Sequence, residues 1–269
     1  MDTLLTALQV DVLTAQHSRL TPSWRSSDPG QPFARLYVIA EGDAEIHHHH
    51  QTTALRPGWL YLIPSHTPLT YRCHTFLDIH WAHFTARARN GLDLFDYLAC
   101  DYALAAAEAP WVYRQMQRLQ QLRRQSGDAV QLETTGIMLQ LLAPFVATAD
   151  PAGQQERRQE LQRFQPVLDY LDRHLAEPLR IPDLARLVHL EPTYFTTRFR
   201  HLFGLPPLRY LHQRRVERAI GLLWRTDAKL DRLAAELGYS DAFHFSRTFK
   251  ALTGQSPSHF RHHPHREQP

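Results

Sequence analysis

The sequence predicts an α+β chain in which a small β-barrel with a helical pair precedes an all-α region containing two helix-turn-helix units joined by a long helix. Three observations support this fold class. Between residues 35 and 84, short apolar segments alternate with turn-forming residues. After about residue 90, apolar residues take helical spacing. The last hundred residues contain one pattern twice, and the length of 269 residues fits about two domains.

The β pattern begins at Arg35, after an irregular stretch in which only residues 10–13 suggest a short strand. The expected strands, with turn formers between them, cover residues 36–40, 44–50, 59–63, 69–73 and 76–84. Turns about every 8–12 residues are typical of a small barrel or sandwich.

Helices are predicted next at residues 92–107, 111–126 and 129–147. The last two form a pair joined at Gly127-Asp128 that is suited to pack on the barrel or on a second subunit. Their apolar stripes are Val112, Met116, Leu119 and Leu122 in one helix and Leu132, Ile137, Leu141 and Leu142 in the other. Turn formers followed by polar residues indicate a linker at 151–162, between a first domain at 1–150 and a second at 163–269. A helix over 164–176 opens the second domain.

The repeat has a separation of 50 positions. Its members are Phe195, Phe199, Gly204, Pro207 and Tyr210, which recur as Phe245, Phe249, Gly254, Pro257 and Phe260. Upstream, Leu184-Ala185 recurs as Leu233-Ala234 with a separation of 49, so one residue has been added in the short turn between these blocks. Each unit is expected to form a helix, a tight turn and a second helix, a shape that usually reads DNA. A long amphipathic helix at 208–224 joins the two units.

Charge and cysteine content agree with this interpretation. Residues 160–269 hold 17 Lys and Arg against 12 Asp and Glu, a net of +5, whereas residues 1–159 hold 13 against 15, a net of −2. A nucleic-acid partner favours a basic half. Two cysteines cannot form a disulfide framework, and we expect neither a signal peptide nor a membrane span. A cytoplasmic protein is predicted.

The repeated units resemble the AraC/XylS family of transcription regulators over residues 164–261. The resemblance is strongest in Gly238-Tyr239-Ser240, in the segment 245–250 (Phe-Ser-Arg-Thr-Phe-Lys) and in the segment 254–257 (Gly-Gln-Ser-Pro). It implies base-edge contacts from the exposed early part of each second helix, namely Thr193, Thr196 and Thr197 in the first unit and Ala242, Phe243, Ser246 and Arg247 in the second. Phosphate contacts are expected from Arg198, Arg200, Arg214, Arg215 and Lys250.

Arg247 is expected to carry the sharpest base contact, because a guanidinium binds guanine through two hydrogen bonds and discriminates by about 1–3 kcal/mol. The alternatives are a surface salt bridge for Arg247 and plain solvent exposure for the threonines. Thr197 stands where the family often has Arg, and His189 stands at the turn position that Gly238 occupies in the second unit. A slightly strained first turn is therefore expected.

The β region, over residues 33–85, resembles a cupin barrel and more closely the AraC-type ligand-binding domain. The run His47 to His50 lies within it, but no carboxylate follows where metal-binding cupins carry Glu. We therefore expect no metal and no cofactor, and interpret the run as a solvated hairpin, a ligand contact or a pH-sensitive edge. The expected effector-binding residues are Trp24, Arg35, Tyr37, Trp59, Tyr61, His80 and Trp81.

The sequence thus predicts a homodimeric, sequence-specific transcription regulator with a small-molecule effector, by resemblance often a sugar, and with promoter DNA as its partner. Activation, with RNA polymerase as a further partner, is favoured by the resemblance. Two alternatives stay open: a constitutive DNA-binding dimer without effector, and a metal-dependent cupin enzyme fused to a DNA-binding tail. No catalytic residues are expected, since the chain has neither a Gly-rich phosphate loop nor a nucleophile triad.

Overall fold

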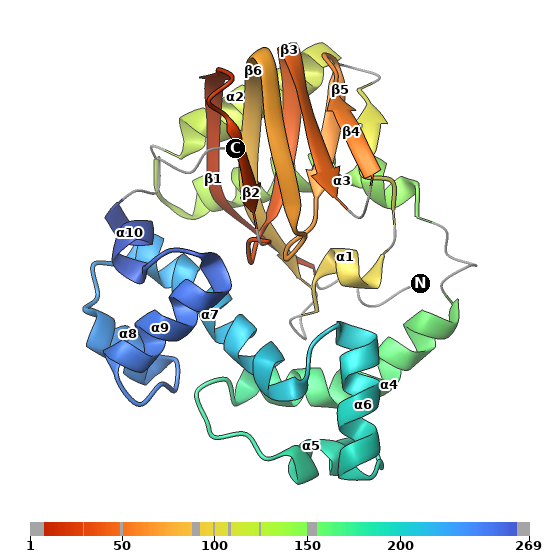
Figure 1. Cartoon of the computed structure of the whole chain (residues 1–269), viewed down its shortest axis with the longest axis vertical. Coiled ribbons are helices and arrows are strands. Elements are labelled where there is room, and N and C mark those ends of the chain that lie inside the picture. Colours follow the sequence, from red (N-terminus) through yellow and green to blue (C-terminus); the bar gives the residue numbers. More distant parts are fainter. Residues whose placement is uncertain are drawn as a thin grey trace. The chain divides into compact units, whose positions relative to one another are not determined.

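The computed structural model describes residues 8–28, 30–48, 51–87, 92–98, 100–106, 109–123, 125–149 and 155–262, apart from the side chains of 96, 97, 109, 156–158, 224 and 225. The chain divides into two compact units (Figure 1). One contains the sheet and two helices, from residues 9–86 and 98–149; the other contains the remaining helices, from residues 87–97 and the part after 150.

The first unit is built on one antiparallel sheet of seven strands. The strands are β1 (Gln9–Leu20), β2 (Arg25–Asp28), β3 (Ala34–His48), β4 (Gln51–Leu55), β5 (Trp59–Ile63), β6 (Leu69–Arg87) and β7 (Ala103–Ala105). Their order is β1-β6-β3-β5-β7, with β2 also paired to β6 and β4 also paired to β3. The long strands β3 and β6 pair with each other along most of their length, from Ala34 opposite Phe84 to His47 opposite Thr70.

The long strands are irregular near their middle. The register of β3 against β6 shifts between Ile39 and Glu41 and again between Gly42 and Ala44. Gly42 has φ +111°, and a Cβ there would lie 2.2 Å from the carbonyl oxygen of Phe76. Such bulges bend a strand and increase its twist. The bend lets one end of β3 pair with β5 and the other with β4.

The interior of the first unit is apolar and aromatic. Its buried cluster draws on β3, β4, β5 and β6 and on Trp24, which directly precedes β2. The members are Trp24, Tyr37, Ile39, Ala44, Ile46, Leu55, Tyr61, Ile63, Leu69, Cys73, Leu77, Ile79 and Trp81. On β6 the members alternate with outward residues, as the two-residue period of a strand requires. Burial of this cluster is the main stabilising contribution to the sheet.

The predicted helical pair is confirmed as α2 (Ala109–Leu122) and α3 (Asp128–Ala147), which pack on each other and on β1. The whole predicted stripe of α2 is buried. On α3 the predicted stripe is correct at Ile137, Leu141 and Leu142 but wrong at Leu132, which is 74% exposed. By length and composition alone α3 could cross a membrane; its buried residues are Ile137, Met138, Leu141, Leu142 and Phe145.

Two sequence-based predictions are wrong in this region. The helix expected over 92–107 is only one turn, α1 (Leu94–Tyr97), followed by β7. Residues 103–105 pair with the open edge of β5, so tertiary pairing overrides their alanine-rich helical tendency. The stretch expected to be mostly irregular contains the twelve-residue β1, whose pairing with β6 and contact with α2 and α3 are long-range.

The second unit is helical, as predicted. Besides α1 it contains α4 (Gln155–Arg173), α5 (Ile181–Leu187), α6 (Pro192–Phe203), α7 (Pro207–Arg225), α8 (Leu230–Glu236), α9 (Ala242–Thr253) and α10 (Pro257–His262). The helix α4 begins nine residues before the expected Phe164, within the predicted linker, and includes Pro166. Phe164, Phe195, Phe199 and Tyr210 form one aromatic cluster of this unit, and Phe245, Phe249 and Phe260 form another.

Candidate functional site

The sequence repeat is also a structural repeat. The helices α5 and α6 form one helix-turn-helix unit, α8 and α9 form the second, and α7 connects them. The two turns close with the same hydrogen bond: Leu190 N donates to the Ala185 carbonyl over 3.0 Å, and Tyr239 N donates to the Ala234 carbonyl over 2.9 Å. Both alanines are fully buried, as expected where two helices cross closely.

Each second helix begins at an acidic cap. The Glu191 carboxylate accepts hydrogen bonds from Thr193 N at 2.8 Å and Tyr194 N at 3.0 Å, and the Asp241 carboxylate accepts from His244 N at 2.7 Å. These bonds, chiefly from Tyr194 N, lower the pKa of Glu191, and the bond from His244 N lowers the pKa of Asp241. Gly204 and Gly254 end the two helices in the left-handed conformation.

The caps and anchors turn one face of each second helix to solvent. In α6 the exposed predicted contacts are Thr193, Thr197 and Arg200, and in α9 they are Phe243, Arg247 and Lys250. These positions correspond at the repeat distance of 50 residues. Thr196, Ala242 and Ser246 are half-buried at the edge of these faces.

The two faces differ in chemistry. The hydroxyls of Thr196 and Thr197 donate to their own helix, to the carbonyls of Pro192 at 2.9 Å and Thr193 at 3.2 Å. They retain acceptor capacity but offer no spare proton in this state. A hollow of about 530 Å³ lies beside them, lined by Thr196, Thr197, Arg200, His201, Gly204 and Pro206. The α9 face does not lose donors in this way. Arg247 is exposed there, and Phe243 is 77% exposed.

The structure buries Arg215, which the sequence predicted as a phosphate contact, so that it is only 5% exposed. Its guanidinium donates three hydrogen bonds to backbone carbonyls, to Leu175 at 2.7 Å, Gly238 at 2.9 Å and Glu177 at 3.0 Å. It therefore ties the turn of the second unit to the chain that follows α4.

Arg214 is also used internally. It pairs with Asp172 at 3.0 Å and Glu217 at 3.0 Å, and its side chain is largely buried. Glu217 also pairs with Arg87 at 2.9 Å. Arg198 remains half exposed but pairs with Glu160 of α4. Of the expected phosphate contacts, Arg200 and Lys250 are the exposed ones.

The expected strain in the first turn is observed. His189 has φ +54°, and its counterpart Gly238 has φ +75°. The two turns differ in their surroundings, because a Cβ on Gly238 would lie 2.0 Å from the carbonyl oxygen of Ala176. Glycine is thus required in the second turn by close approach as well as by φ.

Two aromatic residues, Tyr194 and Tyr239, received no individual role from the sequence. Tyr194 is a large exposed side chain at the start of α6, beside Thr193. Tyr239 is buried behind α9, where its ring packs on Arg215 at 5.4 Å and on Phe245 at 5.4 Å. Burial raises the pKa of Tyr239 to about 12. The available signal was their position beside the acidic caps: Tyr194 lies three residues after Glu191, and Tyr239 lies two residues before Asp241.

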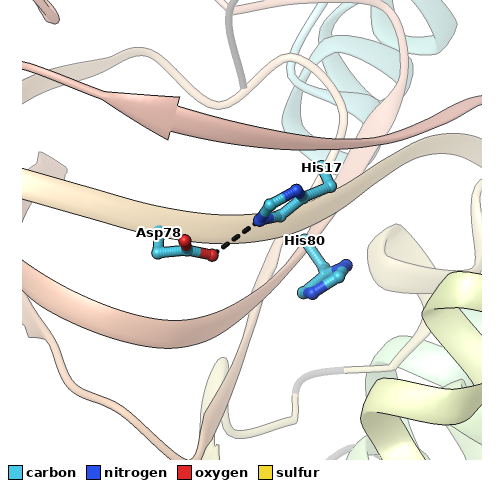
Figure 2. Close-up of side chains that lie close together, drawn as sticks. All are labelled: His17, Asp78 and His80. Atoms are coloured by element: carbon cyan, nitrogen blue, oxygen red, sulfur yellow. Dashed lines mark hydrogen bonds and ion pairs between the residues drawn. The ribbon is translucent and has the colours of Figure 1, made fainter.

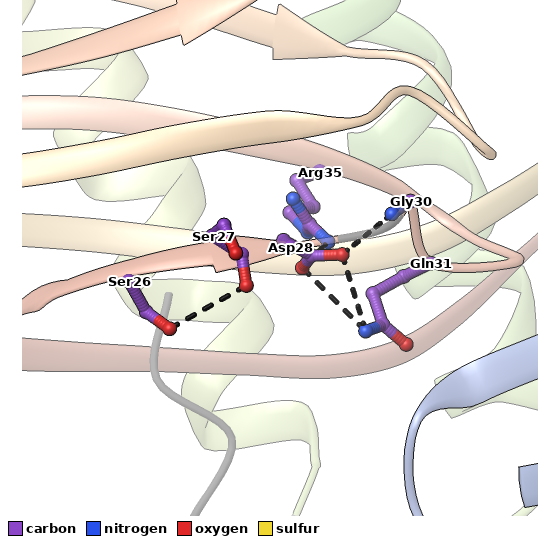
Figure 3. Close-up of polar contacts among 6 residues, drawn as sticks. All are labelled: Ser26, Ser27, Asp28, Gly30, Gln31 and Arg35. Carbon is purple, nitrogen blue, oxygen red and sulfur yellow. Dashed lines mark hydrogen bonds and ion pairs between the residues drawn. The ribbon is translucent and has the colours of Figure 1, made fainter.

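Most expected effector-binding residues form the interior of the sheet unit. Trp24, Tyr37, Tyr61 and Trp81 belong to the buried cluster, and burial raises the pKa of Tyr37. Arg35 is buried and donates to Asp28 at 2.5 Å, while Gly30 N and Gln31 Nε2 donate to the same carboxylate (Figure 3). The indole N–H of Trp24 is buried and has no hydrogen-bond partner among the described residues.

Trp59 and His80 lie elsewhere. Trp59 is half-buried and, with Tyr61, lines a hollow of about 230 Å³ together with Thr52, Thr53, Ala54, Arg56 and Ala103. His80 does not join the interior, because it alternates with the inward residues Ile79 and Trp81 on β6. It contacts Gln120 of α2 instead, and burial lowers its pKa.

Comparison with known proteins agrees with this architecture. A family described as a helix-turn-helix domain matches residues 184–263. The raffinose operon transcriptional regulatory protein RafR of Pediococcus pentosaceus is 23% identical over 233 residues, covering 84% of this chain and 83% of RafR. The MmsAB operon regulatory protein of Pseudomonas aeruginosa is 32% identical over 92 residues, covering 34% of this chain and 30% of that protein.

Among solved structures, that of ToxT from Vibrio cholerae bound to an unsaturated fatty acid superposes with a TM-score of 0.55 at 12% identity, covering 95% of both chains. At this identity the likeness concerns the fold alone: an N-terminal antiparallel sheet followed by a helical helix-turn-helix region. Taken with the matched helix-turn-helix domain and the relatives named as operon regulators, the repeated unit identifies residues 184–263 as an AraC-type DNA-binding domain such as transcriptional regulators carry.

Proposed function

We propose that α6 and α9 are the two base-reading helices of this regulator. The observation that carries the proposal is the pair of exposed faces at corresponding positions, with Thr193 and Thr197 in α6 and Phe243 and Arg247 in α9. Arg247 supplies two donors to a guanine edge, whereas Phe243 meets thymine methyl groups. Thr196, Ala242 and Ser246 contribute at the edge of each face.

Phosphate positioning falls mainly to Arg200 and Lys250, one turn after Thr197 and Arg247 on the same faces. Arg198 assists only where its pairing with Glu160 opens. Because the remaining basic residues Arg214 and Arg215 hold the domain together internally, they act on DNA affinity through folding.

The sheet unit is proposed as a cupin-like effector domain. Its support is the antiparallel sheet with an aromatic interior and the indole N–H of Trp24, which has no partner among the described residues, since a buried donor without a partner calls for an acceptor. A sugar is the first effector class, in line with the relative named for the raffinose operon. A fatty acid is the second, because ToxT binds one in its structure and the interior here is mainly apolar.

A homodimer is proposed through the outer face of α3, with a second copy of this chain as the occupant. Leu132 and Leu139 are exposed there, with Gly136 between them at helical spacing. A stripe of two leucines around a glycine is self-complementary, as a two-fold interface requires. The proposed role is cytoplasmic promoter binding with activation through RNA polymerase and no catalytic step.

In vitro selection of duplexes from a random library, followed by fluorescence anisotropy with the full chain, tests the function. We expect selected sites to bind at least about 10³-fold more tightly than unrelated duplex. Adding raffinose or an unsaturated fatty acid should then change affinity or site spacing. No enrichment by the full chain would overturn DNA reading, whereas enrichment that neither compound alters would support the constitutive dimer.

The dimer is tested separately by sedimentation at increasing concentration. Leu132→Glu should weaken self-association, and Leu119→Val on the buried face of α2 is the matched control for a mild packing change. Equal association of the Leu132→Glu variant and the original chain would remove α3 from the interface.

A further inference from the structure

Outside the proposed DNA and effector sites, three potential metal ligands meet on the face of the sheet that is turned away from the aromatic interior (Figure 2). His17 belongs to β1, and Asp78 and His80 belong to the neighbouring strand β6. Asp78 and His80 are two residues apart, so they project from the same face of β6. The intervening Ile79 projects into the core, which places the group away from the aromatic interior.

The three side chains are close enough to share one ion. One ligand atom from each lies within 4.8 Å of the others, and no other such group of three occurs in the part of the chain that the structure describes. His17 Nε2 is 2.7 Å from Asp78 Oδ1, and the rings of His17 and His80 are 4.6 Å apart. The side chains of His17 and Asp78 are 45% and 21% exposed, so solvent reaches the group from the His17 side.

We propose that His17, Asp78 and His80 bind a divalent transition-metal ion, with Zn²⁺ as the best fit. Two imidazoles and one carboxylate are ligands that zinc prefers, and three protein ligands leave a fourth position for water or an exogenous donor. Ion binding replaces the His17–Asp78 hydrogen bond: in a neutral His17 ring the proton moves from Nε2 to Nδ1, so Nε2 and the Asp78 carboxylate each gain one metal–ligand bond.

The surroundings of His80 suit a ligand. Gln120 Nε2 lies 3.0 Å from His80 Nδ1 and donates to it; turning the carboxamide by 180° brings its oxygen to the same place, where it accepts the Nδ1 proton and leaves His80 Nε2 for the ion. Tyr113 contacts the ring edge-on at 5.7 Å between centroids. Gln120 and Tyr113 both belong to α2, so the ion would join β1 and β6 at a point that α2 also contacts.

The site is separate from the His run that suggested a metal in the sequence. His47 hydrogen-bonds with Thr52 at 2.7 Å and pairs with Glu45 at 3.2 Å. Glu45 also reaches His74 at 3.7 Å, but this second cluster does not bring three ligand atoms as close together as the first. The proposed site therefore takes its carboxylate ligand from Asp78, whereas no carboxylate follows the His run at the spacing of metal-binding cupins.

The test needs a background in which the run cannot bind metal. In the full chain with His47, His48, His49 and His50 all replaced by Gln, Co²⁺ absorption and Zn²⁺ competition against a chromophoric chelator measure binding without DNA or effector. We expect one ion per chain with the visible bands of a low-coordinate Co²⁺ site. His17→Gln, Asp78→Asn and His80→Gln should each weaken Zn²⁺ at least about tenfold.

Two further variants separate ligation from folding. Gln120→Leu removes no ligand but should weaken Zn²⁺ binding about 10–100-fold, because the His80 ring loses the partner that orients it. His74→Gln, also on β6 but outside the group, should leave the affinity unchanged. Circular dichroism without metal checks that each variant folds. Unchanged affinity in His17→Gln and Asp78→Asn, or no bound ion in the run-free background, would overturn the site, whatever the outcome for DNA binding.

Discussion

The two helix-turn-helix units share a plan but not a surface. Both have an acidic cap, two buried phenylalanines and a closing glycine at corresponding positions. The first presents Thr193, Thr197 and Arg200, whereas the second presents Phe243, Arg247 and Lys250. The second turn is also held more tightly, by the Arg215 hydrogen bond and the approach of Ala176. The comparison teaches that the buried framework fixes where a helix lies, while its exposed residues are free to differ.

The largest effect is expected where the two turns differ. Gly238→Ala places a Cβ against the Ala176 carbonyl and forces a side chain into φ +75°. We expect a loss of about 2–4 kcal/mol in the free energy of unfolding and loss of DNA binding. Urea unfolding followed by circular dichroism measures it. His189→Gly in the first turn is the control. We expect it to change the free energy of unfolding by no more than about 1 kcal/mol, because it relieves the backbone strain at His189 but also increases the conformational entropy of the unfolded chain. Equal losses in both variants would show that the two turns are equivalent.

Arg215→Leu should have the next largest effect. It leaves the carbonyls of Leu175, Glu177 and Gly238 without their guanidinium donor in a buried setting. A loss of about 1–3 kcal/mol in unfolding free energy is expected, with DNA affinity reduced only as far as the folded fraction falls. Thermal unfolding and fluorescence anisotropy on the same samples distinguish a loss of folded protein from a direct loss of DNA affinity. A variant that folds normally but binds DNA weakly would restore Arg215 as a phosphate contact.

Arg247→Ala tests the difference between the exposed faces. We expect it to lower the affinity for a selected site roughly 5- to 140-fold, as loss of a bidentate guanine contact predicts, with little change in stability. Thr197→Ala at the corresponding position should cost less, because its hydroxyl proton is used within α6. Anisotropy with the original and base-substituted duplexes measures both.

The reciprocal change sharpens the same comparison. Thr197→Arg gives the first unit the side chain of the second and should add a base preference in reselected sites. If Arg247→Ala weakened all duplexes equally, Arg247 would be a phosphate contact rather than a base contact.

The smallest effect concerns the caps. The pKa of Asp241 is lowered in the folded chain, so its stabilising contribution is complete above its ordinary value of 3.8 and is lost as the pH falls through the lower folded value. Asp241→Ala should lower the thermal midpoint by a few degrees at neutral pH, with the difference shrinking below about pH 4. Asp241→Asn retains a cap oxygen and should remove most of this pH dependence but little stability. A pH-independent difference for Asp241→Ala would exclude the charged cap as its cause.

The sequence predicted the helical half closely because its signals are local and duplicated. Phe195, Phe245 and the closing glycines Gly204 and Gly254 each act within about one helical turn of their own position. The same reasoning failed for residues 92–107, where β5 offers a pairing edge that local tendency cannot reveal. It failed again for Arg214 and Arg215, because only the fold brings Asp172 and three backbone carbonyls to their guanidinium groups.

By itself, then, the sequence determined the repeat, its helix-turn-helix plan and the chemistry of the residues between its anchors, all of which depend on spacing along the chain. Only the tertiary structure decided which arginines face solvent, which aromatic residues of the sheet are interior, and that His17 meets Asp78 and His80 across two strands. The physical reason is that burial and ligand geometry depend on contacts between residues about sixty positions apart, such as His17 and Asp78, and no local pattern records such contacts.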